Sequence, residues 1–356
     1  MNSADPKSLC LRKLSHIAPY TLSILTILLL GLFSVRFYYF VKFPNVSLNG
    51  RDYTYLYIPT GTDFKGLLKI LKEKSVLRDE NSFIFVASRK HFVNRVKAGK
   101  YRLRDGMSNN ELVNHLRSGI QEPVRLSIQN ARTVAELAGK LGHQIEADSA
   151  SLMKLFLDPV YLREFNTNPD NVFVLFIPDT YLIFWNTSAR QLIRKMSTAQ
   201  NAFWNAKRRM KLDSAGLTIQ QTVTLASIVE KETNKDSEKP DIAGVYLNRL
   251  RKGWSLQADP TVIYAWQDYT IKRLMAKHLK IESKYNTYIH TGLPPGPICI
   301  PSINSIDAVL TFRKNGYMYF CAKDDLSGYH KFAVSLAEHR RNAKNYQKAL
   351  DHMNIR

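Results

Sequence analysis

The sequence predicts an α+β protein with an N-terminal transmembrane helix, a strand–helix subdomain beside the membrane, and a second α+β domain at the carboxyl end. An uncharged apolar run near the N-terminus indicates the membrane helix. A strand–turn–helix pattern recurs over the next hundred residues. Amphipathic helical segments then alternate with short apolar strands. With 356 residues, the chain is long enough for about two domains.

The apolar run covers residues 17–35, which include no charged side chain. At the helical rise per residue it spans about 28 Å, close to the thickness of a bilayer's hydrocarbon core. No small-residue cleavage pattern follows, whereas residues 37–40 form an aromatic belt. We therefore prefer an uncleaved anchor over a signal peptide. The prediction is a cytoplasmic tail at 1–16 and an anchor at 17–40, with the long remainder translocated.

Three segments of the next hundred residues align without gaps: 58–71, 103–116 and 128–141. Each reads as an apolar strand end, a turn and an amphipathic helix. Gly61 and Gly106 coincide at the turn, and the predicted N-cap residues are Asp63, Ser108 and Thr133. Glu111 and Glu136 complete two capping boxes. The pattern predicts a subdomain at 50–145 that resembles LysM-like modules, which bind glycan chains; any small α+β domain that reuses this unit is the alternative.

The rest of the chain is divided into a connecting region at 146–215 and a second domain at 216–356. In the second of these we expect a helix that opens at Thr218, a Pro/Gly-rich loop at 292–297, an apolar strand at 317–322 and a basic helix at 335–353.

Glu230 carries the strongest signal for chemistry. On a helix it lies within about 40° of Ile219, Val223 and Ala226, whereas Glu232 points about 160° away. A carboxyl group held against apolar side chains should have a raised pKa. A raised pKa keeps the proton that a general acid must donate at neutral pH. The alternative is that Glu230 pairs with a buried cation such as Arg249 and is structural.

Two polar clusters follow. Gln257, Asp259 and Thr261 alternate, so a strand or extended loop would aim them one way, toward sugar hydroxyl and N-acetyl groups. Asp259 precedes a proline and could equally be a turn or N-cap residue. The other candidates for sugar contacts are Tyr264, Asn286 and Tyr288; a role of the tyrosines in the core is the alternative.

The charge of the chain is strongly basic, with 51 Lys and Arg against 30 Asp and Glu and a net charge of +21. This favours acidic partners: nucleic acid, anionic lipid or an acidic wall polymer. Nucleic-acid binding is supported by the positive charge alone, because the sequence contains no zinc-finger or RNP motif. It is therefore not predicted. The three cysteines form no CxxC pattern, so no metal site is predicted. Cys299 and Cys321 could pair or stay as buried thiols.

Taken in order, the motifs resemble the endolytic murein transglycosylases of the YceG-like family. The matching strings are LASIVEKET at 225–233, LQADPTVIYA at 256–265, YNTYIHTGLPPGPI at 285–298 and YFCAKDDLSGYHKF at 319–332. The segment 98–119 is similar to the family's LysM-like region, and FIPDTY at 176–181 to its central motif. Val174-Leu175 stands where the family has Glu-Gly, and residues 128–131 replace an IPEG-type turn. Both departures concern the expected substrate groove.

The resemblance implies an inner-membrane enzyme that faces the periplasm and cuts the MurNAc–GlcNAc β-1,4 bond within nascent strands. It implies 1,6-anhydro-MurNAc ends, a role in terminating glycan elongation, and peptidoglycan synthases as partners. The catalytic residue would be Glu230, with no metal and no cofactor. A single carboxyl group suffices, because the C6 hydroxyl of the substrate acts as the nucleophile.

Two rival functions remain open. A hydrolytic muramidase would need a second carboxylate near Glu230, and the choices are Asp259, Glu232 and Asp241; Glu232 points away on the helix, which counts against it. A non-catalytic wall-binding membrane scaffold would need only the repeats and the charge.

Overall fold

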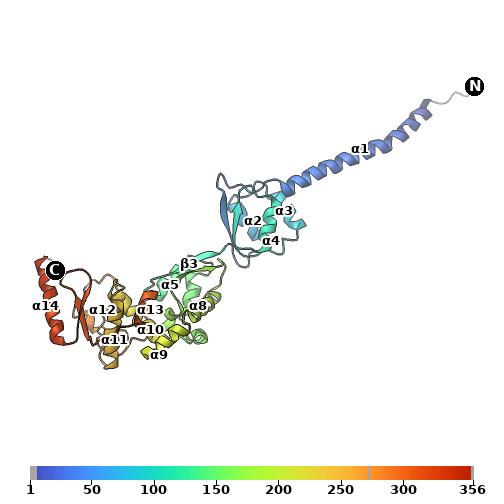
Figure 1. Ribbon diagram of the computed structural model, residues 1–356. Coiled ribbons are helices and arrows are strands. Elements are labelled where there is room, and N and C mark those ends of the chain that lie inside the picture. The colour runs from blue at the N-terminus through green and yellow to red at the C-terminus, as the bar shows by residue number, and fades with distance from the viewer. Residues whose placement is uncertain (1–5, 272, 354–356) are drawn as a thin grey trace, which may run out of the picture. The chain divides into compact units, whose positions relative to one another are not determined.

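The computed structural model describes residues 6–271 and 273–353, with side chains from residue 23 onward (Figure 1). Helices and short antiparallel strands are mixed along the chain, which confirms the predicted α+β class. The chain divides into two compact units. The first contains residues up to Pro123 together with Phe184–Asn186, and the second contains Val124–Ile183 and the residues from Thr187 onward. The domain boundaries predicted from the sequence stay a prediction.

The first unit begins with the apolar helix α1, Pro6–Lys42. Its segment Ser23–Lys42 is long and apolar enough to cross a membrane, by length and composition. The end of α1 is fixed to its unit, because the Phe40 ring packs at 5.7 Å against Phe85 and the Asn109 amide donates to the Phe40 carbonyl at 2.9 Å. The first five residues of the predicted cytoplasmic tail lie outside the described residues.

A two-stranded sheet and three helices form the rest of this unit. Strand β1 pairs antiparallel with β2, and a buried cluster that includes Leu56, Phe83 and Leu112 joins the elements. The predicted caps Asp63 and Ser108 are confirmed, the latter in a full capping box. The LysM-like character of the unit stays a prediction. The elements are β1 (Tyr53–Ile58), α2 (Phe64–Glu73), α3 (Glu80–Arg89), β2 (Gly99–Arg104) and α4 (Asn109–Ser118).

The second unit begins with the third of the aligned segments, whose strand pairs with β4 rather than with the strands of the first two. Thr133 caps the following helix as predicted. A capping box would have the Glu136 carboxylate accept from the backbone N–H of Thr133. It accepts instead from the backbone N–H of Arg132, at 2.7 Å, so the second predicted capping box is wrong. The elements are β3 (Val124–Ile128), α5 (Val134–Gly142), α6 (Ser149–Phe156), α7 (Pro159–Leu162), two 3-10 turns (Arg163–Phe165, Pro169–Leu175), β4 (Asp179–Ile183) and α8 (Ala189–Phe203).

The carboxyl-terminal half of this unit is built around α10, which begins after Thr218 as predicted. The predicted basic helix is α14, and the predicted apolar strand is β5, which pairs with β6. Cys299 and Cys321 are both free. The elements are α9 (Ala206–Ala215), α10 (Ile219–Glu232), α11 (Lys239–Arg251), α12 (Asp259–Trp266), a 3-10 turn (His278–Lys280), α13 (Ile303–Leu310), β5 (Tyr319–Ala322), β6 (His330–Ala333) and α14 (Leu336–His352).

Candidate active site

The last turn of α10 carries two carboxylates in different surroundings. The helix is fixed at its start by the Thr218–Gln221 capping box. Its middle, Thr222 to Val229, is buried on every side. After this buried stretch, polar side chains become accessible again in the last turn, which includes Glu230 and Glu232.

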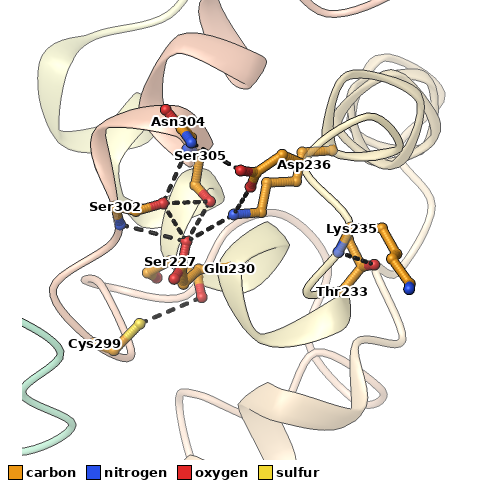
Figure 2. A network of polar contacts seen from close by, with 10 residues as sticks. Ser227, Glu230, Thr233, Lys235, Asp236, Cys299, Ser302, Asn304 and Ser305 are labelled. Atoms are coloured by element: carbon orange, nitrogen blue, oxygen red, sulfur yellow. Dashed lines mark hydrogen bonds and ion pairs between the residues drawn. The ribbon is translucent and has the colours of Figure 1, made fainter. Parts of the chain in front are cut away.

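Glu230 accepts hydrogen bonds from two serines and a lysine (Figure 2). All reach the same oxygen, Oε2: the Ser302 hydroxyl at 2.6 Å, the Lys239 ammonium at 3.2 Å, and the Ser305 hydroxyl. The Lys239 side chain is 6% exposed and that of Glu230 is 15% exposed. Lys239 also pairs with Asp236 at 2.7 Å. The carboxylate thus lies in a nearly closed, charge-assisted network.

This network lowers the pKa of Glu230. Burial alone would raise the pKa, but the hydrogen bonds from Ser302 and Ser305, together with the charge of Lys239, outweigh burial and hold it below its ordinary value. The expectation that apolar neighbours keep Glu230 protonated is therefore wrong. Arg249 is not its cationic partner either; Lys239 is. At neutral pH this carboxylate is ionised.

A cavity of about 410 Å³ lies beside Glu230. Its other walls come from the end of β3, the start of β4 and the start of α13, and they carry amide, hydroxyl and carboxylate groups: Gln129, Asn130, Asp179, Thr180, Ser302 and Asn304. Such groups suit a sugar's hydroxyl and N-acetyl substituents. Asp179 and Thr180 belong to the FIPDTY string, which signalled a motif, whereas no sequence signal marked Ser302 or Asn304.

Glu232 faces α11 and the start of α12 instead. The Tyr246 hydroxyl donates to its carboxylate. Burial, followed by the nearby charge of Asp259, raises the pKa of Glu232 to about 7, although the Tyr246 hydrogen bond and Arg249 act in the opposite direction. The Tyr288 hydroxyl donates to Asp259. Asp259 is exposed, so this cluster opens to solvent.

The structure brings Asp259 and Tyr288 together, but the predicted strand through Gln257, Asp259 and Thr261 is wrong. Helix α12 begins at Asp259, with Pro260 in its first turn, where proline is favoured. Gln257 is exposed and has a left-handed backbone, with φ of 52°. Thr261 is buried, and its hydroxyl bonds the Ala258 carbonyl at 2.7 Å.

The two remaining candidates differ in accessibility. Asn286 is fully buried, and its amide donates to the carbonyls of Leu279 and Ile281 at 2.9 and 3.0 Å. These bonds fix the loop before the Pro/Gly-rich segment. The Tyr264 ring packs 4.7 Å from that of Tyr285 and lines two further cavities, of about 200 and 290 Å³.

A carboxyl group that titrates near pH 7 and an ionised carboxylate, both at the end of one helix, can donate and accept protons, as in glycan-cleaving enzymes. A model of the YceG-like family matches residues 56–345. The chain belongs to the YceG-like family.

Individual relatives agree with this. The chain is 31% identical over 306 residues to the endolytic murein transglycosylase of Bacillus subtilis (strain 168), covering 81% of this chain and 83% of the relative. It is 28% identical over 364 residues to that of Streptococcus pneumoniae (strain D39), covering 92% of this chain and 65% of the relative. A crystal structure of a YceG-like protein from Listeria monocytogenes has a TM-score of 0.53 and 29% identity, over 82% of this chain and 98% of that one. The resemblance seen in the sequence is confirmed.

Proposed function

We propose that this chain is a peptidoglycan lytic transglycosylase. It cuts the MurNAc–GlcNAc β-1,4 bond within nascent strands and leaves 1,6-anhydro-MurNAc ends. Family membership and relatives named endolytic murein transglycosylases support the reaction class. The observation that carries the chemistry is the setting of Glu232 at the end of α10: its carboxyl group is bound by the Tyr246 hydroxyl, lies near the exposed Asp259, and has a raised pKa.

The general acid in this proposal is Glu232. A general acid must hold its proton before the reaction and lose it during the reaction, which needs a pKa near the working pH. Glu232 meets this condition with a pKa of about 7, whereas the pKa of Glu230 is lowered. Glu230, the choice made from the sequence, remains the alternative because it lines the 410 Å³ cavity. In our proposal Glu230 and Lys239 hold the last turn of α10 and so position Glu232.

The reaction then needs no second catalytic carboxylate. Glu232 donates its proton to the glycosidic oxygen, the bond from that oxygen to C1 of MurNAc breaks, and GlcNAc leaves with a free 4-hydroxyl. Positive charge develops at C1. The Glu232 carboxylate accepts the proton of the C6 hydroxyl, whose oxygen bonds to C1 and closes the anhydro ring. The nucleophile is already part of the substrate, so proximity supplies much of the rate.

One observation favours hydrolysis as a second candidate. Asp259 is close enough to raise the pKa of Glu232, and a pair of carboxyl groups is what a muramidase uses. Hydrolysis would leave reducing ends, and anhydro ends are one water lighter. Mass spectrometry of the digested strands therefore separates the two reactions.

The decisive experiment compares Glu232→Gln with Glu230→Gln on uncrosslinked strands. We expect Glu232→Gln to bind strands but release no anhydro product, because glutamine cannot donate the proton. Glu230→Gln should keep measurable turnover. The reverse pattern would return the acid to Glu230, and normal turnover by both variants would refute an acid on α10.

We further propose that α1 anchors the chain in the inner membrane, with its N-terminus in the cytoplasm and the second unit in the periplasm, beside peptidoglycan synthases. The apolar span Ser23–Lys42 supports anchoring. A topology reporter fused after Arg356 should report a location outside the cytoplasm. A cytoplasmic location would contradict this orientation.

A further inference from the structure

A second cavity adjoins the one beside Glu230 and differs from it in charge. Glu230 and Asn130 line the first cavity, while Lys231 and Arg132 line the second. Glu230 and Lys231 are consecutive in α10, and Asn130 and Arg132 lie two residues apart in the β3–α5 loop, so the same two segments line both cavities. Pro260, the residue after Asp259, also lines the second cavity. This cavity therefore lies beside the last turn of α10, at the residue between the two carboxylates, and beside the start of α12.

The second cavity combines two cations with aromatic and apolar walls. Arg132 and Lys231 supply the charge, and Tyr264, Tyr269 and Ile298 line the interior. The Arg132 guanidinium lies 5.1 Å from the centre of the Tyr269 ring, a cation–π contact that orients its N–H donors. The volume of this second cavity is about 200 Å³, against about 410 Å³ for the cavity beside Glu230. Because ligand pockets usually start at about 300 Å³, the smaller cavity suits a substituent rather than a sugar ring.

Both cations are available to a ligand. Across the part of the chain whose side chains are described, neither Arg132 nor Lys231 forms an ion pair. The acidic neighbour Glu136 is already occupied, since its carboxylate binds Lys140 at 2.6 Å and accepts from the Arg132 backbone N–H at 2.7 Å. Two unpaired cations at an aromatic cavity attract a carboxylate, which accepts charge-assisted hydrogen bonds from both.

We propose that Arg132 and Lys231 form a carboxylate-binding subsite that takes the acidic substituent on the muramic acid of the strand. The inference rests on the proposed function, because that function supplies the substrate. Muramic acid carries a lactyl group, which ends in its own carboxylate or continues into a peptide with carboxylates. The subsite binds this acidic arm and so selects which muramic acid is presented to the end of α10.

The test uses the full-length protein and three kinds of uncrosslinked strand: peptide-bearing, peptide-bearing with carboxylates capped as methylamides, and denuded with a free lactyl carboxylate. For the unaltered chain, kcat/KM on capped strands should be about tenfold lower than on the better acidic strand, mainly through KM. Arg132→Gln with Lys231→Gln should bring the ratio near one. Arg190→Gln is the matched control, since Arg190 also stacks on a tyrosine, at 4.6 Å from Tyr161.

The acidic strand that loses its advantage in the double variant identifies the source of the carboxylate, peptide or lactyl, and either result supports the subsite. A ratio near one for the unaltered chain, or a ratio that the double variant leaves unchanged, overturns it. The single variants guard against misfolding of the double one. Strand affinity, measured in the Glu232→Gln background, separates this proposal from the proposed function. If the protein prefers acidic strands but the unaltered chain cleaves none of them, only the proposed function is refuted. If the unaltered chain cleaves strands but shows no preference for acidic ones, only the carboxylate-binding subsite is refuted.

Discussion

Replacing Glu232 by glutamine should change the pH dependence of stability in a direction opposite to the same change at Glu230. The pKa of Glu232 is raised from 4.5 to about 7. The folded state therefore holds the Glu232 proton more tightly than the unfolded state does. Stability from the protonated group is complete below about pH 4.5 and is lost as the pH rises through about 7. Glutamine does not titrate, so the variant does not lose this stability.

The size of the effect follows from the shift. Each pKa unit corresponds to about 1.4 kcal/mol, so a rise from 4.5 to about 7 gives an upper value of about 3 kcal/mol. The side chain is only partly buried, and we expect about 2 kcal/mol after solvent screening. Relative to the unaltered chain, Glu232→Gln should thus gain about 2 kcal/mol of unfolding free energy between pH 5 and pH 8.

Denaturant unfolding in detergent, followed by tryptophan fluorescence at several pH values, measures this difference. Trp204 is a suitable probe because it is buried in the same hydrophobic cluster as α10. Glu230→Gln is the matched control. Its pKa is lowered in the folded state, so its ionised form stabilises the fold above the unfolded pKa and loses this effect as the pH falls. Glu230→Gln should therefore be less stable than the unaltered chain at neutral pH. Curves for Glu232→Gln that run parallel to those of the unaltered chain from pH 5 to pH 8 would refute the reasoning.

Three further predictions concern the neighbours of Glu232, the Glu230–Lys239 pair and the Pro/Gly-rich loop. Tyr246→Phe removes a donor to the Glu232 carboxylate and should raise its pKa, so the alkaline limb of the pH–rate profile moves to higher pH; Asp259→Asn removes a like charge and should move that limb to lower pH. A shift in the same direction for both variants would contradict these contacts. Lys239→Met leaves a buried carboxylate without its cation and should cost about 3 kcal/mol in denaturant unfolding, while a loss below 1 kcal/mol would mean that the pair is dispensable. Gly296→Ala would place Cβ 1.9 Å from a backbone carbonyl oxygen and should lower the unfolding free energy by at least about 2 kcal/mol; an unchanged midpoint would show that the loop can move aside.

Elements with local signals could be predicted from the sequence. The caps Asp63, Ser108, Thr133 and Thr218 were correct, because a side chain that caps a helix contacts backbone only two or three residues away. The apolar helix and the basic helix α14 likewise depend on composition within one segment. The pairing of β3 with β4 joins strands some fifty residues apart, and no local pattern indicates such a partner.

Helix α12 shows where alternation misleads. Gln257, Asp259 and Thr261 alternate as in a strand, yet the chain turns at Gln257 with a positive φ and a helix starts at Asp259. Pro260 fits this helix start as well as it fits a turn. The decisive contact is the buried hydrogen bond between the Thr261 and Thr287 hydroxyls, at 2.9 Å, which joins residues 26 positions apart. Periodicity over five residues includes no information about that bond.

The choice between Glu230 and Glu232 depended on which side of α10 is apolar, and the helix has no polar side along most of its length. Helical angle therefore could not rank the two carboxylates. The pKa of each carboxyl group is set by the groups that contact it at the end of the helix. Glu230 is surrounded by Lys239 and by two serines at the start of α13, whereas Glu232 lies beside Tyr246 and Asp259. Hydrogen-bond donors and a cation lower a carboxyl pKa, while burial beside a like charge raises it. The more apolar side of a helix is thus a poor guide to its general acid when other elements place hydrogen-bond donors and cations against that side.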